Sequence, residues 1–296
     1  MTTADILSQV SEALAARAAA ARAGVVALVP DCAPPSSGIL WQKDLVVASE
    51  QALPRKGAIR VPLPDGHAVE ATLIGRDPGT NIALLRLAEP AEVALPARAE
   101  PVLGALVLLI GGDGAGGASV RLGLVRSLGP AWHSRAGGRI DRRILLDARL
   151  GRAEEGGPVL DTSGHLIGMS TRGPRGSALV IPAATLARTV EPLRDSGRVA
   201  RGWLGVALQP VAVPEQQAAA GRGLMIMGVT PGSPAAKAGL LTGDILVMLD
   251  DVAATHPARL AERLGPDSIG SRCQLTLIRA GAPLTLTVII EAREAS

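Results

Sequence analysis

Residues 229–245 read VTPGSPAAKAGLLTGDI, and this stretch contains the signals for a short helix bounded by turns. Ser233 can accept a hydrogen bond at a helix N-terminus, and Pro234 suits the first helical position because no N–H is needed there. Gly239 then ends the helix at low steric cost, since glycine readily adopts the left-handed backbone. The stretch therefore predicts a short helix at 235–238.

A second helix and a hairpin are predicted further along the same segment. The helix is expected at 257–264, where Leu260 and Leu264 lie one turn apart on one face. The hairpin is expected around Ala280-Gly281, because apolar residues alternate with threonine on both sides of it. Strands combined with two short helices indicate a compact α+β domain after the polar stretch 194–198.

The chain before this domain consists of short apolar runs separated by Gly, Pro and Asp. Strands at this spacing indicate an all-β barrel or sandwich. A hairpin turn is expected at 64–66, where Asp-Gly supports the positive φ of tight turns, and a short helix is expected at 183–193. The predicted strands include the runs 38–40, 45–47, 83–85, 106–110 and 144–146.

The composition excludes several classes of function. The 296 residues suffice for two domains, and with three Trp, no Phe and no Tyr the core must consist of Val, Leu, Ile and Ala. The missing rings disfavour base stacking, and the net charge of +3 is scattered, so no nucleic-acid partner is expected. Cys32 and Cys273 show neither metal-type spacing nor a disulfide framework, and no metal or cofactor is predicted.

The first segment, residues 1–23, is predicted to be an amphipathic helix. Ile6, Val10 and Leu14 recur at helical spacing and are interrupted by charged residues. No apolar run is long enough for an export signal or a membrane span. The prediction is therefore a cytoplasmic protein with no membrane partner.

Residues 201–290 resemble a PDZ domain of the bacterial type. The block quoted above carries this resemblance, together with RGWLGV at 201–206, which is similar to the loop that receives a ligand's C-terminal carboxylate. Consecutive backbone N–H groups in such a turn bind anions, and the following strand has a free edge for an extended peptide. The alternative is that the leucines only form the core of an inert module. The predicted peptide-binding residues are Trp203, Leu204, Gly205, Val206, Leu260 and Leu264.

A PDZ-like segment behind a Gly-rich all-β segment resembles the HtrA/Deg family of trypsin-like serine proteases. Three stretches are similar to those that carry the family's catalytic histidine, aspartate and serine: 44–53, 66–87 and 147–169. The resemblance implies a mainly β fold, with a trypsin-like double β-barrel at 24–195 and a small α+β PDZ domain at 200–293.

All three catalytic positions of the family carry other residues in this chain. Gln51 stands at the histidine position, Asn81 at the aspartate position and Glu155 at the serine position. The triad needs a hydroxyl nucleophile, a base that titrates near neutral pH and a carboxylate that orients the base. The oxyanion nest is also altered, at Ala153 and Glu154. These replacements predict a pseudoprotease with no catalytic residues, and hence not an enzyme.

The predicted function is that of a peptide-binding or protein-binding adaptor or chaperone-like factor that acts through its PDZ domain. One alternative is a structural or regulatory subunit of a larger complex, and a second is an enzyme of the serine-protease family with rewired catalytic residues. The expected partners are polypeptide C-termini or extended peptides. The family's trimer forms through aromatic side chains near the N-terminus of the protease domain, and it is not expected here because Phe and Tyr are missing.

Overall fold

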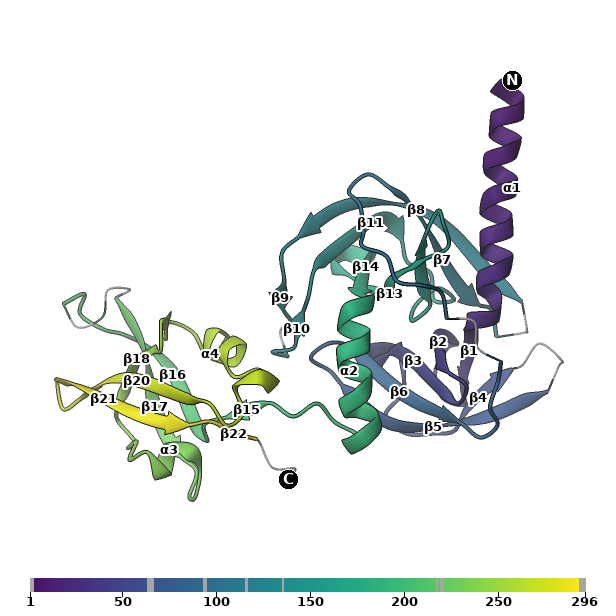
Figure 1. The fold of residues 1–296 in the computed structure, drawn as a ribbon. Coiled ribbons are helices and arrows are strands. Elements are labelled where there is room, and N and C mark those ends of the chain that lie inside the picture. Colours follow the sequence, from purple (N-terminus) through teal and green to yellow (C-terminus); the bar gives the residue numbers. More distant parts are fainter. Residues whose placement is uncertain are drawn as a thin grey trace. The chain divides into compact units, whose positions relative to one another are not determined.

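The computed structural model describes residues 3–62, 67–92, 95–114, 117–134, 136–216, 218 and 221–292. The chain forms two compact units (Figure 1), residues 1–136 with 140–199, and residues 200–296 with 137–139. The hairpin turn predicted at 64–66 lies outside the described residues.

The first half of unit 1 is a closed six-stranded barrel. Its strands neighbour one another in the order β1-β2-β3-β6-β5-β4, and Leu28, Leu40, Val46 and Leu85 fill the interior. The elements are β1 (Val25–Pro30), β2 (Ser36–Gln42), β3 (Leu45–Ser49), η2 (Glu50–Ala52), β4 (Ile59–Pro62), β5 (Ala68–Asp77) and β6 (Ile82–Leu87).

The second half of unit 1 is another closed six-stranded barrel, in the order β11-β14-β13-β12-β7-β8. Val107, Leu109, Ile144 and Val180 lie in its interior. The elements are β7 (Leu106–Gly112), β8 (Ala118–Gly129), β11 (Arg143–Arg149), β12 (Pro158–Asp161), β13 (Leu166–Arg172), η3 (Pro174–Gly176) and β14 (Ser177–Pro182), with a separate ribbon of β9 (Trp132–His133) and β10 (Arg139–Ile140).

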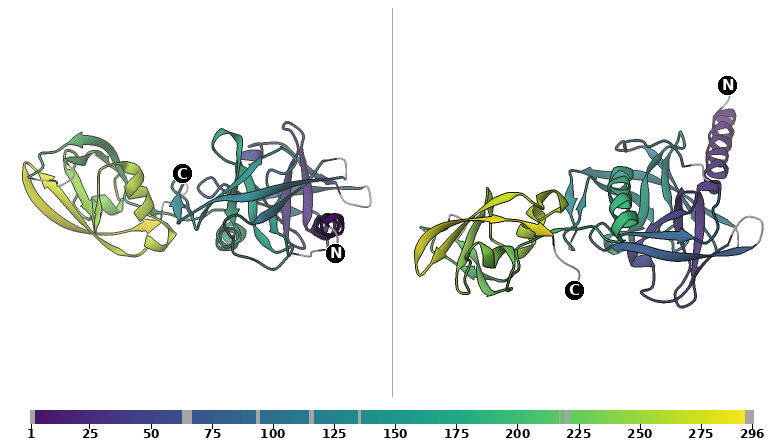
Figure 2. Two further views of the ribbon diagram at one scale, coloured as in Figure 1. Left: turned by 90° about the horizontal axis from the view of Figure 1, so that it is seen from above. Right: turned by 60° about the horizontal axis from the view of Figure 1, so that its bottom comes forward.

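A third apolar cluster joins the two barrels. Because successive side chains of a strand point to opposite faces, the barrels also direct aliphatic residues outward, among them Val47 and Ile82 from the first and Leu108 from the second. Helix α2 (Ala183–Ser196) lies against this cluster (Figure 2). It runs three residues beyond the predicted end, since Gly197, with φ of 71°, is the first left-handed residue that can stop it.

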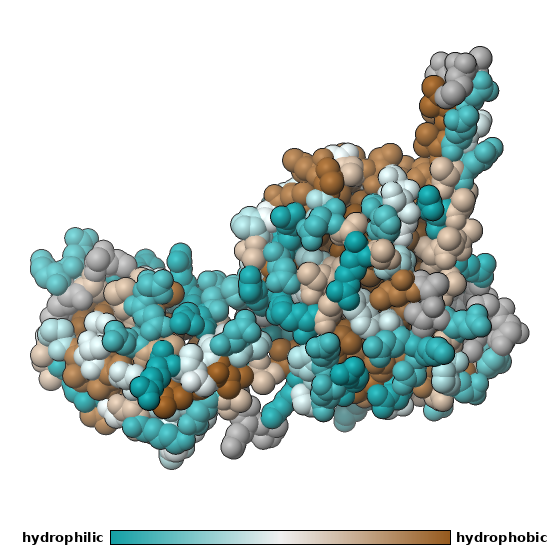
Figure 3. Space-filling model, viewed as in Figure 1, coloured by the Kyte–Doolittle hydropathy of each residue, from teal (hydrophilic) through white to brown (hydrophobic). Residues whose placement is uncertain are grey.

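The segment predicted as an amphipathic helix forms α1 (Thr3–Ala21), followed by η1 (Arg22–Gly24), and its apolar face is packed in the second half of the helix. Leu14 and Ala18 pack against the cluster between the barrels, whereas Ile6 and Val10 are each 46% exposed. Figure 3 shows this exposed apolar stripe along the helix. Among the described residues, no helix is long and apolar enough to cross a membrane.

Unit 2 is an α+β module built on a sheet with the strand order β16-β17-β18-β20-β21. The predicted hairpin is confirmed, since Arg279 pairs with Ala282 across Ala280 and Gly281. Its elements are β15 (Gly202–Trp203), β16 (Val206–Ala212), β17 (Arg222–Val229), α3 (Pro234–Lys237), β18 (Ile245–Leu249), β19 (Val252–Ala253), α4 (Pro257–Arg263), η4 (Pro266–Ser268), β20 (Arg272–Arg279), β21 (Ala282–Ile289) and β22 (Glu291–Ala292).

Both predicted helices of unit 2 are present. The Oγ of Ser233 accepts a hydrogen bond from the N–H of Ala236 and so caps α3, as expected for this N-cap residue. Helix α4 is capped by His256, whose Nδ1 accepts from the N–H of Ala258. The mainly β prediction, two barrels followed by a small α+β module, is confirmed.

Candidate functional site

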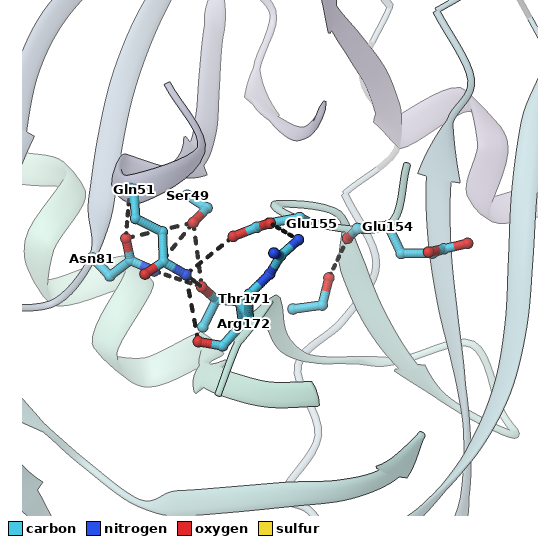
Figure 4. A network of polar contacts seen from close by, with 8 residues as sticks. Ser49, Gln51, Asn81, Glu154, Glu155, Thr171 and Arg172 are labelled. Carbon is cyan, nitrogen blue, oxygen red and sulfur yellow. Dashed lines mark hydrogen bonds and ion pairs between the residues drawn. The ribbon is translucent and has the colours of Figure 1, made fainter. Parts of the chain in front are cut away.

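The structure brings Gln51, Asn81 and Glu155 together where the two barrels meet (Figure 4). Gln51 lies in η2, directly after β3. Asn81 ends the turn between β5 and β6, and Glu155 lies in the loop before β12. All three side chains therefore come from connections at strand ends, and the closure of each barrel positions them.

The turn that carries Asn81 is built by a buried carboxylate. Asp77 accepts hydrogen bonds from the N–H groups of Gly79 and Thr80 and from the Thr80 hydroxyl. Asn81 follows with φ of 58°, a left-handed conformation that asparagine tolerates better than most residues. Its Oδ1 accepts from the Gln51 N–H at 2.8 Å, so this amide fixes the backbone of the neighbouring loop.

Thr171 is the centre of the polar cluster. Its Oγ1 accepts hydrogen bonds from Asn81 Nδ2 at 2.6 Å and from Gln51 Nε2 at 2.7 Å. Gln51 Nε2 also donates to Glu155 Oε1 at 3.0 Å, and Glu155 Oε2 forms an ion pair with Arg172 at 3.3 Å. The Glu155 side chain is only 9% exposed, so its charge is balanced within the cluster.

Thr171 and Arg172 were not singled out in the sequence. The only available signal was the polar end of an otherwise apolar strand, Ser170-Thr171-Arg172, which is common at strand ends. The cluster holds a carboxylate, two carboxamides and hydroxyl groups. Within it Glu155 is the side chain that can accept a proton, and Arg172 is a fixed cation.

The loop that carries Glu155 is closed by its own backbone. The N–H of Glu155 donates to the carbonyl of Arg152 at 3.2 Å, and the Glu155 carbonyl accepts from the N–H of Ser37 at 2.8 Å. The N–H of residue 155 is therefore engaged and does not point to a reacting oxygen.

Glu154 and Glu155 do not form one site. The buried Glu154 carboxylate accepts from the Ser119 hydroxyl and lies 3.6 Å from an Arg121 nitrogen, whereas Glu155 faces Gln51. Within the described part of the chain, no group of three or more His, Cys, Asp or Glu side chains could hold a metal ion.

No histidine is among the hydrogen-bond partners of the cluster within the described residues. His67 is exposed and lies 3.7 Å from Glu89. His165 contacts Asp161, and His256 caps α4. His133 lies in β9, away from every contact described for Gln51, Asn81 and Glu155.

The predicted peptide-binding loop of unit 2 precedes the edge strand of the sheet. Gly205 has φ of 81°, and a Cβ there would collide with the Ser233 side chain, so this position requires glycine. Among the described residues, strand β16 pairs with β17 alone, so its other edge can accept a further strand.

The six predicted binding residues differ in accessibility. Leu204 and Leu260 are each 2% exposed and belong to the core of unit 2. Val206 and Leu264 pack against that core but stay partly exposed, as does Trp203 in β15. Trp203, Val206 and Leu264 are thus the side chains that a ligand can reach without rearrangement, whereas Gly205 is buried.

Comparison with known domain families matches both units. Residues 36–169 match a family described as a trypsin-like peptidase domain, and residues 202–290 match the PDZ domain. The chain is therefore a trypsin-like peptidase domain joined to a PDZ domain.

Curated relatives are similar over most of this chain. A probable periplasmic serine endoprotease DegP-like of Brucella suis is 30% identical over 270 residues, covering 86% of this chain and 52% of the relative. The periplasmic pH-dependent serine endoprotease DegQ of Escherichia coli is 30% identical over 267 residues, covering 86% and 58%. This chain thus spans about half the length of the curated relatives that it matches.

Solved structures show the same architecture. The HtrA-type protease AlgW with tripeptide has a TM-score of 0.68 at 25% identity, covering 96% of this chain and 98% of that one. The serine endoprotease from Yersinia pestis has a TM-score of 0.70 at 23% identity, covering 94% and 97%. The relatives and the solved structures therefore show that this chain resembles HtrA-type proteases in sequence and in the order of its two domains.

The relatives correct two predictions made from the sequence. They are named serine endoproteases, which contradicts the prediction that the chain is not an enzyme. That prediction depended on the residues at the three triad positions and on the altered nest at 153–154. They are also named periplasmic, which contradicts the predicted cytoplasmic location. The latter depended on residues 1–23, whose pattern describes a helix and does not report a compartment.

Proposed function

We propose that this HtrA/Deg-type chain binds polypeptides through its PDZ domain and acts on them as an adaptor or chaperone-like factor. The C-terminal carboxylate of the ligand would lie at the loop 203–206, and the preceding residues would extend β16 by one strand. The free edge of β16 directly after this loop is the observation that carries the proposal.

The backbone of the loop supports this mode of binding. The carbonyls of Leu204 and Gly205 accept from Ala235 and Thr230, which fixes the loop on α3 and the end of β17. With the carbonyls held inward, the N–H groups of the same turn are the donors left for an anion. An added strand gains main-chain hydrogen bonds, and Val206 and Leu264 would contact its apolar side chains.

The test measures fluorescence anisotropy of a random library of peptides with free C-termini, repeated with amidated C-termini. Amidation is expected to abolish binding because it removes the carboxylate. Leu264→Lys is expected to weaken binding about tenfold, since the change removes a buried apolar contact. The matched control is Leu241→Lys, at a leucine that is 55% exposed and outside the predicted groove. Absence of binding by the library would contradict the proposal.

A native pull-down separates this function from that of a structural subunit. Clients that exchange and share apolar C-termini support peptide capture. A single partner at fixed stoichiometry, retained by the Leu264→Lys variant, would favour a subunit of a larger complex.

Peptide-bond hydrolysis with rewired residues is a second proposed function, and the names of the relatives favour it. In this chain Glu155 would accept the proton of an attacking water, because it is the ionisable acceptor of the cluster. Cleavage of fluorogenic casein should then fall at least a hundredfold in Glu155→Gln and stay unchanged in the control Glu191→Gln, on the exposed face of α2. Equal rates in parent and Glu155→Gln would contradict this role.

We also propose a periplasmic location, by similarity to the relatives that are named periplasmic. Cell fractionation of the source bacterium with an antibody to the native chain tests this location. Recovery with the cytosolic fraction would contradict it.

A further inference from the structure

Two adjoining cavities lie beside the polar cluster, on the first barrel and the loop that carries Glu155. The larger has a volume of about 450 Å³ and includes Gln51, Glu155 and Arg172 in its lining. The smaller has a volume of about 220 Å³ and lies over Arg55–Ile59 and β5. Pro54 lines both cavities, so they adjoin at this residue, and the two together are named here the 54-groove.

The lining of the 54-groove is basic. It contains five cationic side chains but only two carboxylates, those of Glu70 and Glu155. The five cations are Arg55, Lys56, Arg76, Arg152 and Arg172.

Two of the five cations already have counter-ions. Arg172 pairs with Glu155 at 3.3 Å, and Arg76 pairs with Glu50 at 3.2 Å. For Arg55, Lys56 and Arg152 the described residues supply no side-chain hydrogen bond or ion pair, and all three are exposed. The groove therefore presents three uncompensated positive charges.

A buried hydroxyl gives an independent indication of a ligand. Ser36 lines the larger cavity and is only 3% exposed, yet its Oγ has no hydrogen-bond partner among the described residues. Such an unsatisfied buried hydroxyl is costly, and a rotation of the Ser36 side chain toward the cavity would let a bound hydrogen-bond acceptor satisfy it. A carboxylate is an acceptor that also balances the nearby Arg152.

We propose that the 54-groove binds carboxylate groups, and that its ligand is an acidic segment of a polypeptide rich in Asp or Glu. This inference rests on the proposed function because both take a polypeptide as the ligand. The residues that would bind it here line the 54-groove and do not belong to the PDZ domain. Guanidinium groups bind carboxylates through paired hydrogen bonds, and the cations of the 54-groove are distributed over both cavities, so more than one carboxylate can be bound. The groove thus selects the composition of the segment, whereas the PDZ loop selects its end.

The test uses peptides that the PDZ loop cannot hold. Acetylated and amidated peptides of alternating Asp and Ala are compared with peptides in which every Asp is replaced by Asn. Binding is measured with an environment-sensitive dye on Cys32, whose exposed Sγ lies 3.3 Å from the Lys56 carbonyl, while Cys273 is buried and unavailable to the dye. The dye therefore reports occupancy of the 54-groove itself.

The variants isolate the charge of Arg152. Arg152→Gln is expected to weaken the acidic peptide about tenfold, and Arg152→Lys should restore most of the affinity. The matched control is Arg126→Gln, at an exposed arginine of β8 that does not line the groove, with an expected change below about twofold. Ser36→Ala should weaken binding several-fold without loss of folding.

Each outcome decides the inference. Binding of the Asp peptide but not the Asn peptide supports it, and competition by millimolar succinate would show that a small free dicarboxylate can occupy the same groove. Three results would overturn it. The first is equal affinity for the Asp and Asn peptides, and the second is equal weakening by Arg152→Gln and Arg126→Gln. The third is tighter binding of a DNA oligonucleotide than of the acidic peptide. PDZ binding of free C-termini is measured separately, so loss of one activity is distinguishable from loss of the other.

Discussion

Gln51 Nε2 donates a hydrogen bond to Glu155 Oε1 at 3.0 Å, and this contact joins the first barrel to the second. The same nitrogen donates to Thr171, which also accepts from Asn81. Two loops are thus tied directly to one threonine near the end of β13, and the loop of Glu155 is tied to it through Gln51. The arrangement at the meeting point of the barrels is therefore an ordered hydrogen-bonded cluster and not a set of solvated side chains.

The cluster should contribute to the stability of the first unit. Thr171→Val is expected to lower the free energy of unfolding by about 1–3 kcal/mol, because two amide donors lose their acceptor in a buried place. Urea unfolding followed by circular dichroism measures this change. The control is Thr72→Val on the exposed face of β5, where a change below about 0.5 kcal/mol is expected; similar losses in both variants would exclude a special role for Thr171.

The three positions at which the family carries its catalytic triad can be tested together. The probe is a fluorophosphonate, which reacts with activated serines. Glu155→Ser alone should not be labelled above the parent, since no imidazole lies among its partners to activate the hydroxyl. Gln51→His, Asn81→Asp and Glu155→Ser combined should be labelled at least about tenfold faster than the single variant, because the members of a triad act together. Rapid labelling of the single variant would show that another base activates residue 155.

The PDZ unit should lose stability in acid through Asp244. Arg279 donates two hydrogen bonds of 2.8 Å to this carboxylate, which is 2% exposed, and they hold the pKa of Asp244 below its usual range although burial acts to raise it. A carboxylate whose folded pKa is lowered stabilises the fold above its unfolded pKa, near pH 4. This stabilisation is lost as the pH falls through the lower folded value.

Arg279→Met should therefore destabilise the PDZ unit by about 2–3 kcal/mol at pH 7, because it leaves a buried carboxylate without its counter-ion. The difference from the parent should shrink as the pH falls below about 4. Urea unfolding at several pH values measures it, with Arg272→Met at an exposed arginine of β20 as the control. A difference that stays constant with pH would contradict the role of Asp244.

The hairpin of β20 and β21 contains a strained residue. Ala280 has φ of 50° and precedes Gly281 with φ of 83°, and a turn with two positive φ values favours asparagine at its first position. Ala280→Asn is expected to stabilise the PDZ unit by about 0.5–1 kcal/mol, measured by thermal or urea unfolding. Ala282→Asn, at a paired strand position, should instead destabilise it.

Local signals in the sequence were sufficient to predict individual helices and turns. Ser233, Pro234 and Gly239 each act within a few residues of their own position, so α3 and its limits could be predicted from capping chemistry. The turn at Ala280-Gly281 could be predicted for the same reason. The end of α2 was placed three residues too early because the polar residues 194–196 resemble a linker when their packing is unknown.

The sequence by itself determined the order of the two domains, the strands and helices, and the residues at the three family positions, because these depend on residue type and local spacing. Only the tertiary structure decided that Thr171 joins Gln51 to Asn81, that the Glu155 N–H is engaged with Arg152, and that Arg55, Lys56 and Arg152 line one groove. The two contacts of Thr171 join residues 120 and 90 positions apart, whereas the Glu155–Arg152 turn is local. Barrel closure brings them together, and no local pattern encodes which strand ends become neighbours when a barrel closes.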